Sequence, residues 1–324
     1  MLASRGESLK WFVKAEANRK KLNKNDLVLN TENLSGNMKI AVTGSTGFVG
    51  KRYMDIVYKD YEKAALDLRN VAPEAMDLKG INAIVHLAGK AHEMQPIPDS
   101  IYFNVNYELT KDLADRARAA GVSHFIYISS TKVYGDEIPG VVNEDSPCLP
   151  VDAYGKSKRK AEEYLLSIQS PEFTVAIIRP PLVYGPGVKG NMIRLMELAG
   201  KKIPLPFGKT GNARSMVYVD NLVALINRVI EKKAGGIFVG GDLSPLSTDK
   251  LITLMRKSMG NATGLITIPH FFRKILKRVK PALYIRLFGS FEVDNKATNQ
   301  KIDFTPPYTS EEGIAVMVQW YLNK

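Results

Sequence analysis

The chain has 324 residues and a mass of 35.9 kDa, with 45% hydrophobic and 24% charged residues and a mean hydropathy of −0.14. This composition is typical of a soluble globular protein and excludes a mini-scaffold or an intrinsically disordered chain. The formal charge of +12 at pH 7 suits an acidic small substrate, an anionic membrane surface or nucleic acid.

The only cysteine, Cys148, excludes an intrachain disulfide and a cysteine-based zinc cluster. We therefore expect a reducing, cytoplasmic compartment. No run approaches about 18 uninterrupted apolar residues, so no transmembrane span is predicted. Residues 1–37 are polar and lack the apolar region of a secretory leader. We interpret them as a disordered extension, or as an upstream start with Met38 as the functional first residue, with an amphipathic arm around Trp11 as the alternative.

From Lys39 onward, short apolar strands alternate with helical stretches. The predicted strands include residues 40–42, 83–85, 125–128 and 174–178, and the predicted helices include residues 48–58, 106–120 and 153–167. This alternation predicts an α/β protein with a Rossmann-type, doubly wound parallel sheet. After Arg179, proline and glycine become frequent, which predicts loops that build a substrate site.

A glycine-rich loop, Thr43-Gly-Ser-Thr-Gly-Phe-Val-Gly50, follows the first predicted strand and opens a helix. In this context the glycines permit a tight turn, a close approach of the backbone to a pyrophosphate, and close packing of helix on strand. Free N–H groups at the helix start then face the phosphates. The predicted dinucleotide-binding residues of the loop are Gly44, Thr46, Gly47, Phe48, Val49 and Gly50. We place the NAD(P)-binding domain at residues 38–180 and a smaller, mainly substrate-binding α/β part, interleaved with the sheet, at residues 181–324.

The choice between NAD and NADP depends on the end of the second strand. Asp67 lies twenty positions after Gly47, a spacing that suits a hydrogen bond to the adenosine ribose. Arg69, two residues further on, would favour a 2′-phosphate. Both cofactors therefore stay open.

Two segments carry candidate catalytic side chains. Tyr154-Gly-Lys-Ser-Lys158 places a phenol and an ammonium group on one face at the start of a predicted helix. The ammonium would stabilise the phenolate, and Lys158 could also hold the nicotinamide ribose. Upstream, Ser130 ends a predicted strand at the edge where ligands of open α/β sheets bind.

The ordered set of motifs resembles the extended short-chain dehydrogenase/reductases, the NAD-dependent epimerase/dehydratase family. The set comprises the glycine loop, His86-Leu-Ala-Gly89, Phe103-Asn-Val-Asn106, Ser129-Ser-Thr-Lys-Val-Tyr-Gly135 and Tyr154-Gly-Lys-Ser-Lys158. The resemblance covers about residues 38–322. It implies catalytic roles for Ser130, Tyr154 and Lys158. It also implies cofactor contacts at Leu87, Ala88, Asn106 and Lys158, a structural role for His86, no metal site and a homodimer.

The resemblance also implies a nucleoside-diphosphate sugar, UDP-linked, as substrate. Arg214 in Asn212-Ala-Arg-Ser-Met-Val-Tyr-Val-Asp220 takes the place of the family's diphosphate-binding arginine, and a planar guanidinium suits phosphate oxygens. Asn191 is similar to a position near the nucleotide, with a helix cap as the alternative. Lys132 is the third predicted substrate residue. No nucleic-acid-binding module is recognised.

Departures from the family pattern narrow the reaction. Thr131 and Lys132 stand where dehydratases carry an acidic pair, which argues against a 4,6-dehydratase. The late Arg-x-Gly-Asp segment of the 4-epimerases is absent, and the chain between the second and third strands is short. We therefore favour a UDP-4-keto-6-deoxy-N-acetylhexosamine 4-reductase in surface polysaccharide precursor synthesis. A UDP-glucose or UDP-N-acetylglucosamine 4-epimerase is the alternative, and a catalytically inactive dinucleotide-sensing protein is the second alternative.

Residues 271–280 form a predicted helix with apolar residues at 271, 272, 275, 276 and 279 and cations between them. One interpretation is a weak peripheral contact with an anionic membrane. We favour the other, a helix of the substrate part whose apolar stripe faces the core and whose polar face is basic.

Overall fold

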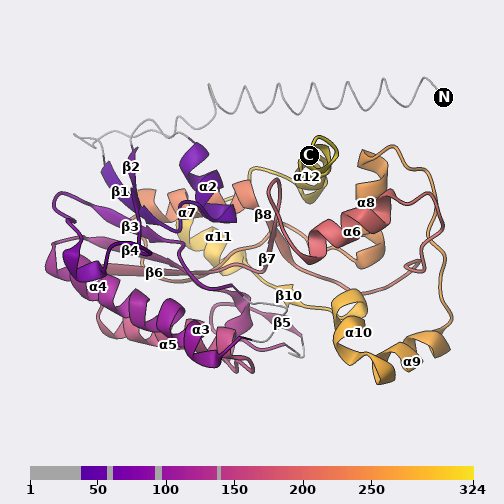
Figure 1. The fold of residues 1–324 in the computed structure, drawn as a ribbon, viewed down its shortest axis with the longest axis horizontal. Helices are drawn as coiled ribbons and strands as arrows, with labels where there is room; N and C mark the ends of the chain where they lie inside the picture. Colours follow the sequence, from indigo (N-terminus) through magenta and orange to yellow (C-terminus); the bar gives the residue numbers. More distant parts are fainter. Residues whose placement is uncertain (1–37, 57–60, 92–96, 137–139) are drawn as a thin grey trace.

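The computed structural model describes residues 38–56, 61–91, 97–136 and 140–324. The predictions for residues 1–37 lie outside this range. Its centre is a six-stranded sheet with the strand order β2-β1-β3-β4-β6-β9, in which all neighbouring strands are parallel (Figure 1). The strands are β1 (Met38–Thr43), β2 (Tyr61–Leu66), β3 (Ala83–His86), β4 (His124–Ile128), β6 (Thr174–Arg179) and β9 (Gly236–Val239).

Helices cover both faces of the sheet (Figure 1). Helices α4 (Leu109–Ala119) and α5 (Ala153–Ser167) pack on the face that carries Ala41, Ile84 and Phe125. Helices α2 (Phe48–Asp55), α7 (Val219–Glu231) and α11 (Lys296–Ile302) pack on the face that carries Ile40 and Val42. Successive strand residues point to opposite faces, so a sheet covered on both sides needs continuous apolar strands. The predicted doubly wound α/β fold is confirmed.

The strand order reverses between β1 and β3, which places the ligand crevice of this sheet at the carboxyl ends of these strands. Among the described residues, β2 is the edge strand of the sheet. The segment from Asp67 to Asn82 contains turns and the short 3₁₀ helix η1 (Pro73–Ala75) but no strand. The adenosine side of the crevice is therefore built by the end of β2 and this irregular segment.

A second hydrophobic core lies beside the sheet. It is enclosed by α6 (Asn191–Gly200), α8 (Thr248–Ser258), α12 (Ser310–Leu322) and the parallel pair of β7 (Leu182–Tyr184) and β8 (Met216–Tyr218). Because β9, α7 and α11 join the sheet from later in the chain, the two parts interleave. The exact domain boundary stays a prediction.

Shorter elements connect these parts. They are α3 (Asp99–Phe103), the π-helix η2 (Asn104–Glu108), the 3₁₀ helix η3 (Thr131–Val133), the pair β5 (Val141–Val142) and β10 (Glu292–Val293), α9 (His270–Val279) and α10 (Pro281–Phe288). Within the described ranges, no helix is long and apolar enough to cross a bilayer.

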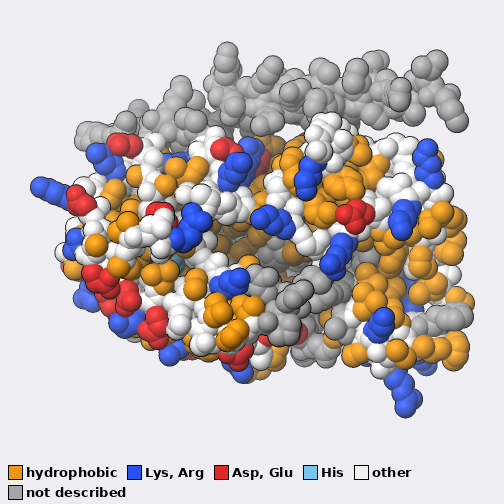
Figure 2. All heavy atoms as spheres, viewed as in Figure 1, with side chains coloured by type: hydrophobic (Ala, Val, Ile, Leu, Met, Phe, Trp, Pro, Cys, Tyr) orange, Lys and Arg blue, Asp and Glu red, His pale blue; other side chains and the backbone are white. Residues whose placement is uncertain are grey.

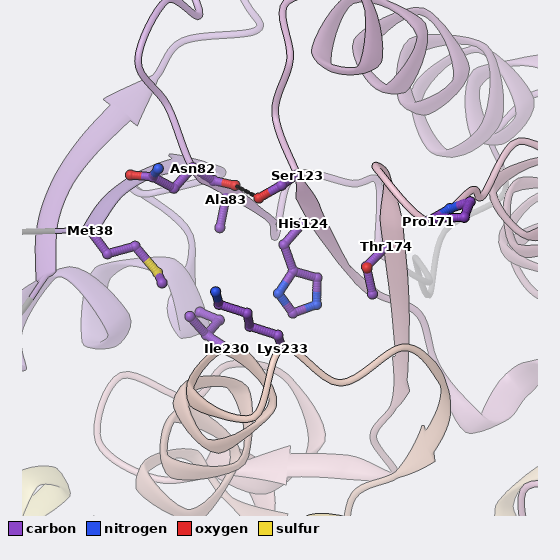
Figure 3. Close-up of a pocket in the computed structure, with 9 residues that line it drawn as sticks. All are labelled: Met38, Asn82, Ala83, Ser123, His124, Pro171, Thr174, Ile230 and Lys233. Atoms are coloured by element: carbon purple, nitrogen blue, oxygen red, sulfur yellow. Dashed lines mark hydrogen bonds between the residues drawn. The ribbon is translucent and has the colours of Figure 1, made fainter. Parts of the chain in front are cut away.

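A hollow of about 170 Å³ lies at the amino ends of the strands, opposite the expected site (Figure 3). Its lining includes Met38, Ala83, His124 and Thr174, from four strands, and Lys233. The pKa of His124 falls to about 4 because of its burial. Ligands of open α/β sheets bind at the carboxyl ends, so this hollow is not the candidate site.

Candidate active site

The glycine loop and α2 pack too closely for side chains. Gly44 has φ +66°, and a Cβ there would lie 2.6 Å from the backbone nitrogen of Ala88. A Cβ on Gly50 would lie 2.0 Å from the carbonyl oxygen of Gly44. The loop therefore touches both the end of β3 and its own helix through backbone atoms.

The start of α2 fits a dinucleotide pyrophosphate. No side chain from the described part of the chain caps the helix at Gly47, so its first-turn N–H groups are available to an anion. The Phe48 and Val49 side chains pack against hydrophobic cores, and Thr46 is exposed. These three predicted cofactor residues would therefore contribute mainly backbone groups.

His86 joins elements rather than presenting a ligand. Its Nδ1 lies 2.6 Å from Thr43 Oγ1, and its Nε2 lies 2.9 Å from Thr110 Oγ1. Complete burial lowers the pKa of His86 to about 3, so the ring is neutral at physiological pH. Thr43 Oγ1 also accepts a hydrogen bond of 3.2 Å from the backbone of Ala88. The ring thus fixes β3 against β1 and α4, as a structural histidine would.

Asn106 connects the loop after β3 to α5. It lies in η2, and π-helical turns are frequent at functional sites. Its Oδ1 accepts from the Lys90 backbone at 2.7 Å, and its Nδ2 donates to Ser157 Oγ at 3.1 Å. A Cβ on Gly89 would lie 3.0 Å from Asn106 Oδ1 and 3.2 Å from Lys158 Nζ. The loop that meets Gly44 therefore also meets the predicted catalytic lysine. The neighbouring predicted cofactor residue Leu87 packs on the core of the sheet.

Ser130 and Tyr154 meet at the carboxyl end of β4. Ser130 is the cap residue directly before η3, and its hydroxyl interacts with the Tyr154 hydroxyl. Burial raises the pKa of Tyr154 above its ordinary value, while the Ser130 hydrogen bond acts in the opposite direction. The phenol is therefore protonated in this arrangement.

Lys158 lies one helical turn further along α5. Its ammonium group donates to the carbonyl of Ile128 at 2.9 Å and lies 4.6 Å from the centre of the Tyr127 ring. Burial lowers the pKa of Lys158 to about 8, and Glu162 opposes this shift. The side chain reaches the end of β4 and Gly89, a position that fits the ribose-holding role.

The predicted substrate residues lie on separate elements. Arg214 Nε donates to the carbonyl of Gly289 at 2.9 Å and its Nη2 to that of Ile285 at 3.0 Å, so its guanidinium group also caps α10. Asn191 is exposed as the first residue of α6, and the cap position belongs to Gly190. Lys132, in η3, forms ion pairs with Asp136 and Asp152.

Asp67 and Arg69, which are expected to determine the preference for NAD or NADP, contact each other. Asp67 directly follows β2, as predicted. Its carboxylate accepts from the Arg69 backbone at 3.0 Å and from Asn70 Nδ2 at 2.6 Å. Arg69 Nε lies 3.5 Å from the same carboxylate. These hydrogen bonds hold the pKa of Asp67 below its usual value. This geometry favours neither cofactor.

Comparison with known proteins decides the family. The model of the NAD dependent epimerase/dehydratase family matches residues 40–241. This chain belongs to that family. The resemblance seen in the motifs is confirmed, and the family's nicotinamide dinucleotide agrees with the expected cofactor class, NAD or NADP.

Individual members of the family match over nearly their full length. A UDP-glucose 4-epimerase of Vibrio cholerae is 34% identical, covering 87% of this chain and 95% of that protein. An N-acetyl-alpha-D-glucosaminyl-diphospho-ditrans,octacis-undecaprenol 4-epimerase of Escherichia coli O157:H7 is 27% identical, covering 88% and 95%. The solved structure of a UDP-glucuronic acid 4-epimerase from Bacillus cereus in complex with NAD has a TM-score of 0.69 at 19% identity, covering 88% and 99%. At that identity the structure shows the fold alone.

The sequence did not indicate two ion pairs, one buried and one partly buried. Glu162 and Arg179 form a bidentate pair beneath α5, with oxygen–nitrogen distances of 3.0 and 2.6 Å and almost no exposure. Arg52 of α2 binds Asp220 in the same manner, at 2.5 and 2.7 Å. In the sequence, Arg179 and Asp220 each stand as a charge within an otherwise apolar stretch, whereas Arg52 and Glu162 lie in polar surroundings. The second pair ties the segment that carries Arg214 to the helix of the glycine loop.

Proposed function

We propose that the chain transfers hydride at C4 of a nucleoside-diphosphate sugar, with a UDP-linked hexose or N-acetylhexosamine as substrate. The observation that carries the proposal is the Ser130–Tyr154 hydroxyl pair at the carboxyl end of β4. Lys158 lies beside Gly89, in the loop that also packs on the glycine loop. The name of the 34% identical relative supports a UDP-sugar.

In this proposal the side chains handle the proton of O4. Ser130 hydrogen-bonds O4 and orients it, and Tyr154 exchanges the O4 proton as the C4–H bond breaks or forms. Lys158 holds the ribose beside the nicotinamide, and Arg214 contacts the diphosphate with its remaining N–H groups. Bound NAD or NADP supplies the hydride acceptor or donor. Asn191 and Lys132 stay proposals for the substrate side.

Epimerisation at C4 is the first candidate reaction. Two relatives that match over 95% of their own length are named 4-epimerases, at 34% and 27% identity. Tyr154 would take the O4 proton, and after hydride returns to the other face of C4 it would give the proton back. This preference reverses the order that the sequence alone suggested.

Reduction of a 4-keto-6-deoxy sugar is the second candidate, and the edge of the sheet favours it. In the part of the chain that the structure describes, β2 is the edge strand and residues 67–82 add no strand beyond it, so they give the adenosine side less cover than a further strand would supply. A cofactor that must retain hydride through an epimerase cycle needs tight binding, whereas a reductase exchanges its cofactor each turnover.

We propose a role in surface polysaccharide precursor synthesis and place the reaction in the cytoplasm. A free Cys148 thiol suits the reducing conditions of that compartment. From the family we propose a homodimer. A dinucleotide-sensing protein without activity is the remaining alternative, and the assembled Ser130, Tyr154 and Lys158 argue against it.

The decisive experiment starts from the protein as purified. Its ultraviolet spectrum and extracted cofactor are determined, and it is then incubated with UDP-hexoses and UDP-N-acetylhexosamines without added cofactor. Bound NAD together with conversion between C4 epimers establishes the epimerase. An empty protein that is silent on those sugars, but oxidises NADH or NADPH with a UDP-4-keto-6-deoxy sugar, establishes the reductase.

Two variants test the assignment in either assay. Tyr154→Phe removes the proton donor and acceptor and is expected to lower kcat by at least about 100-fold, in line with general acid–base catalysis. Lys156→Gln, an exposed neighbour on the same helix, is the matched control. Silence of the wild type in both assays would instead favour the sensor.

A further inference from the structure

Helix α9 exposes an apolar face at the end of the molecule far from the sheet (Figure 1). Phe271 is 66% exposed, Ile275 43% and Val279 68%. Their spacing of four residues places them on one side of the helix. Leu276 packs on the second core. Among the described apolar residues of the helix, three are therefore exposed and Leu276 faces the core, whereas the sequence favoured a stripe that faces the core.

The surroundings of this face are strongly basic. From Lys250 to Phe291 the chain has nine Lys/Arg and no Asp/Glu. In Figure 2, hydrophobic and basic side chains lie together over this end of the molecule. We call the combination of exposed apolar and basic side chains on α9 and its junction with α10 the basic face. It consists of Phe271, Lys274, Ile275, Lys277, Arg278, Val279 and Lys280, all exposed.

The basic face is held in a fixed direction. Arg273 donates to the carbonyls of Gly208 and Lys209 at 3.1 and 3.0 Å, and its guanidinium group lies 5.0 Å from the Phe288 ring. The carbonyls at the end of α10 accept from Arg214. These contacts hold both α9 and α10 on the rest of the protein. The apolar residues are therefore exposed while the two helices stay packed in place.

We propose that the basic face docks the enzyme on the surface of a bilayer that contains anionic lipids. An amphipathic helix with apolar residues between cations binds in this way, with the apolar side chains in the headgroup region and the cations beside lipid phosphates. The 42 residues from 250 to 291 contain no carboxylate side chain, so their net positive charge complements an anionic surface. Three apolar side chains offer far less than the roughly 800 Å² per partner of a stable protein interface, which argues against a second copy of the chain as occupant.

Docking would have a consequence for the proposed function, on which this step rests. Arg214 donates to the Ile285 carbonyl of α10, the helix that directly follows the basic face, so the residue proposed for the substrate diphosphate is linked to that face. The docked enzyme would hold its diphosphate site close to the bilayer surface.

The test is co-sedimentation of the full chain with vesicles of phosphatidylcholine containing phosphatidylglycerol, and with pure phosphatidylcholine. We expect binding to the anionic vesicles only, weakened by salt. A cation near an anionic surface contributes about 1 kcal/mol, or about fivefold in partitioning, so removal of four predicts a loss of at least about 100-fold. The basic-face variant carries Lys274→Gln, Lys277→Gln, Arg278→Gln and Lys280→Gln.

Two further variants sharpen the test. The matched control removes four exposed cations elsewhere: Lys79→Gln, Arg118→Gln, Lys232→Gln and Lys296→Gln. A third variant keeps the cations and carries Phe271→Ser, Ile275→Ser and Val279→Ser. We expect the control to bind like the wild type and the serine variant to bind weakly, with circular dichroism of all three unchanged.

Three outcomes would overturn the proposal. They are absence of wild-type binding to anionic vesicles, equal losses in the basic-face variant and the control, and light scattering that shows the basic face to mediate self-association instead. The assay uses no substrate, so failure of docking leaves the proposed C4 chemistry standing, and failure of that chemistry leaves the vesicle result standing.

Discussion

Replacement of Lys158 by methionine is the most informative perturbation of the site. Lys158 is almost completely buried, and burial lowers its pKa from 10.5 to about 8. The buried ammonium group therefore destabilises the folded protein, although it bonds the carbonyl of Ile128. Methionine keeps most of the side-chain volume and removes the charge.

The magnitude follows from the pKa difference. A fall from 10.5 to about 8 corresponds to about 3 kcal/mol. Below pH 8 the lysine is protonated in both states, so the whole penalty is present. Between about pH 8 and 10.5 only the unfolded chain keeps the proton, and stability therefore rises with pH. In Lys158→Met this rise is absent, and the unpaired Ile128 carbonyl costs about 1–3 kcal/mol at every pH.

The assay is urea unfolding of the dinucleotide-free protein at a series of pH values from neutral to about 10. We expect the variant to equal or exceed the wild type in stability near pH 7 and to fall below it at high pH. Lys63, whose pKa burial also lowers to about 8, contributes equally to both proteins and cancels in the difference. The exposed Lys156→Met is the control. Parallel pH curves for wild type and Lys158→Met would refute the reasoning.

Three further predictions concern the buried pair, the glycine loop and α10. Glu162→Gln leaves the Arg179 charge buried without its partner and is expected to cost about 3–5 kcal/mol in urea unfolding, against less than about 0.5 kcal/mol for the exposed Glu163→Gln; similar losses would contradict this account. Gly50→Ala forces α2 away from the glycine loop, so fluorescence titration with NADH or NADPH should show at least about tenfold weaker binding. An unchanged Kd would contradict the proposal that the glycine loop and the start of α2 bind the pyrophosphate. Arg214→Lys loses the forked geometry that serves two carbonyls, so we expect faster limited proteolysis at α10 and a raised KM; intact resistance to protease would show that α10 needs no such support.

The sequence predicted those parts of the fold that depend on local chemistry. Apolar runs located four of the six sheet strands to within two residues, and α5 has the predicted bounds, Ala153–Ser167. That helix begins where the Asp152 carboxylate caps it by accepting from the Gly155 backbone. The glycine loop could also be predicted, because the backbone contacts between a strand and a phosphate-binding helix require glycine at these positions.

Interactions set by tertiary packing could not be predicted. Arg52 and Asp220 are 168 positions apart, and the sequence around either residue does not indicate that the other is its partner. The four-residue spacing of Tyr154 and Lys158 indicated a shared helix face correctly, but the direction of the lysine depends on a carbonyl at the end of β4. Likewise, the motif around Arg214 gave no sign of α10, whose terminal carbonyls lie more than seventy residues downstream. The hydrogen-bond partners of long side chains depend on how the helices and strands pack in the folded protein.

The position of α12 has a consequence for biosynthesis. Ile314, Met317 and Val318 are fully buried among residues of β7, β8 and α8, and α11 closes one face of the sheet. Neither core is therefore complete until residues 296–322 have been synthesised, although the glycine loop is made first. At about 5–20 residues per second, the nascent chain spends roughly ten seconds or more with apolar strands lacking their final cover. During translation this architecture leaves apolar strands exposed for longer than a chain whose amino-terminal half folds alone.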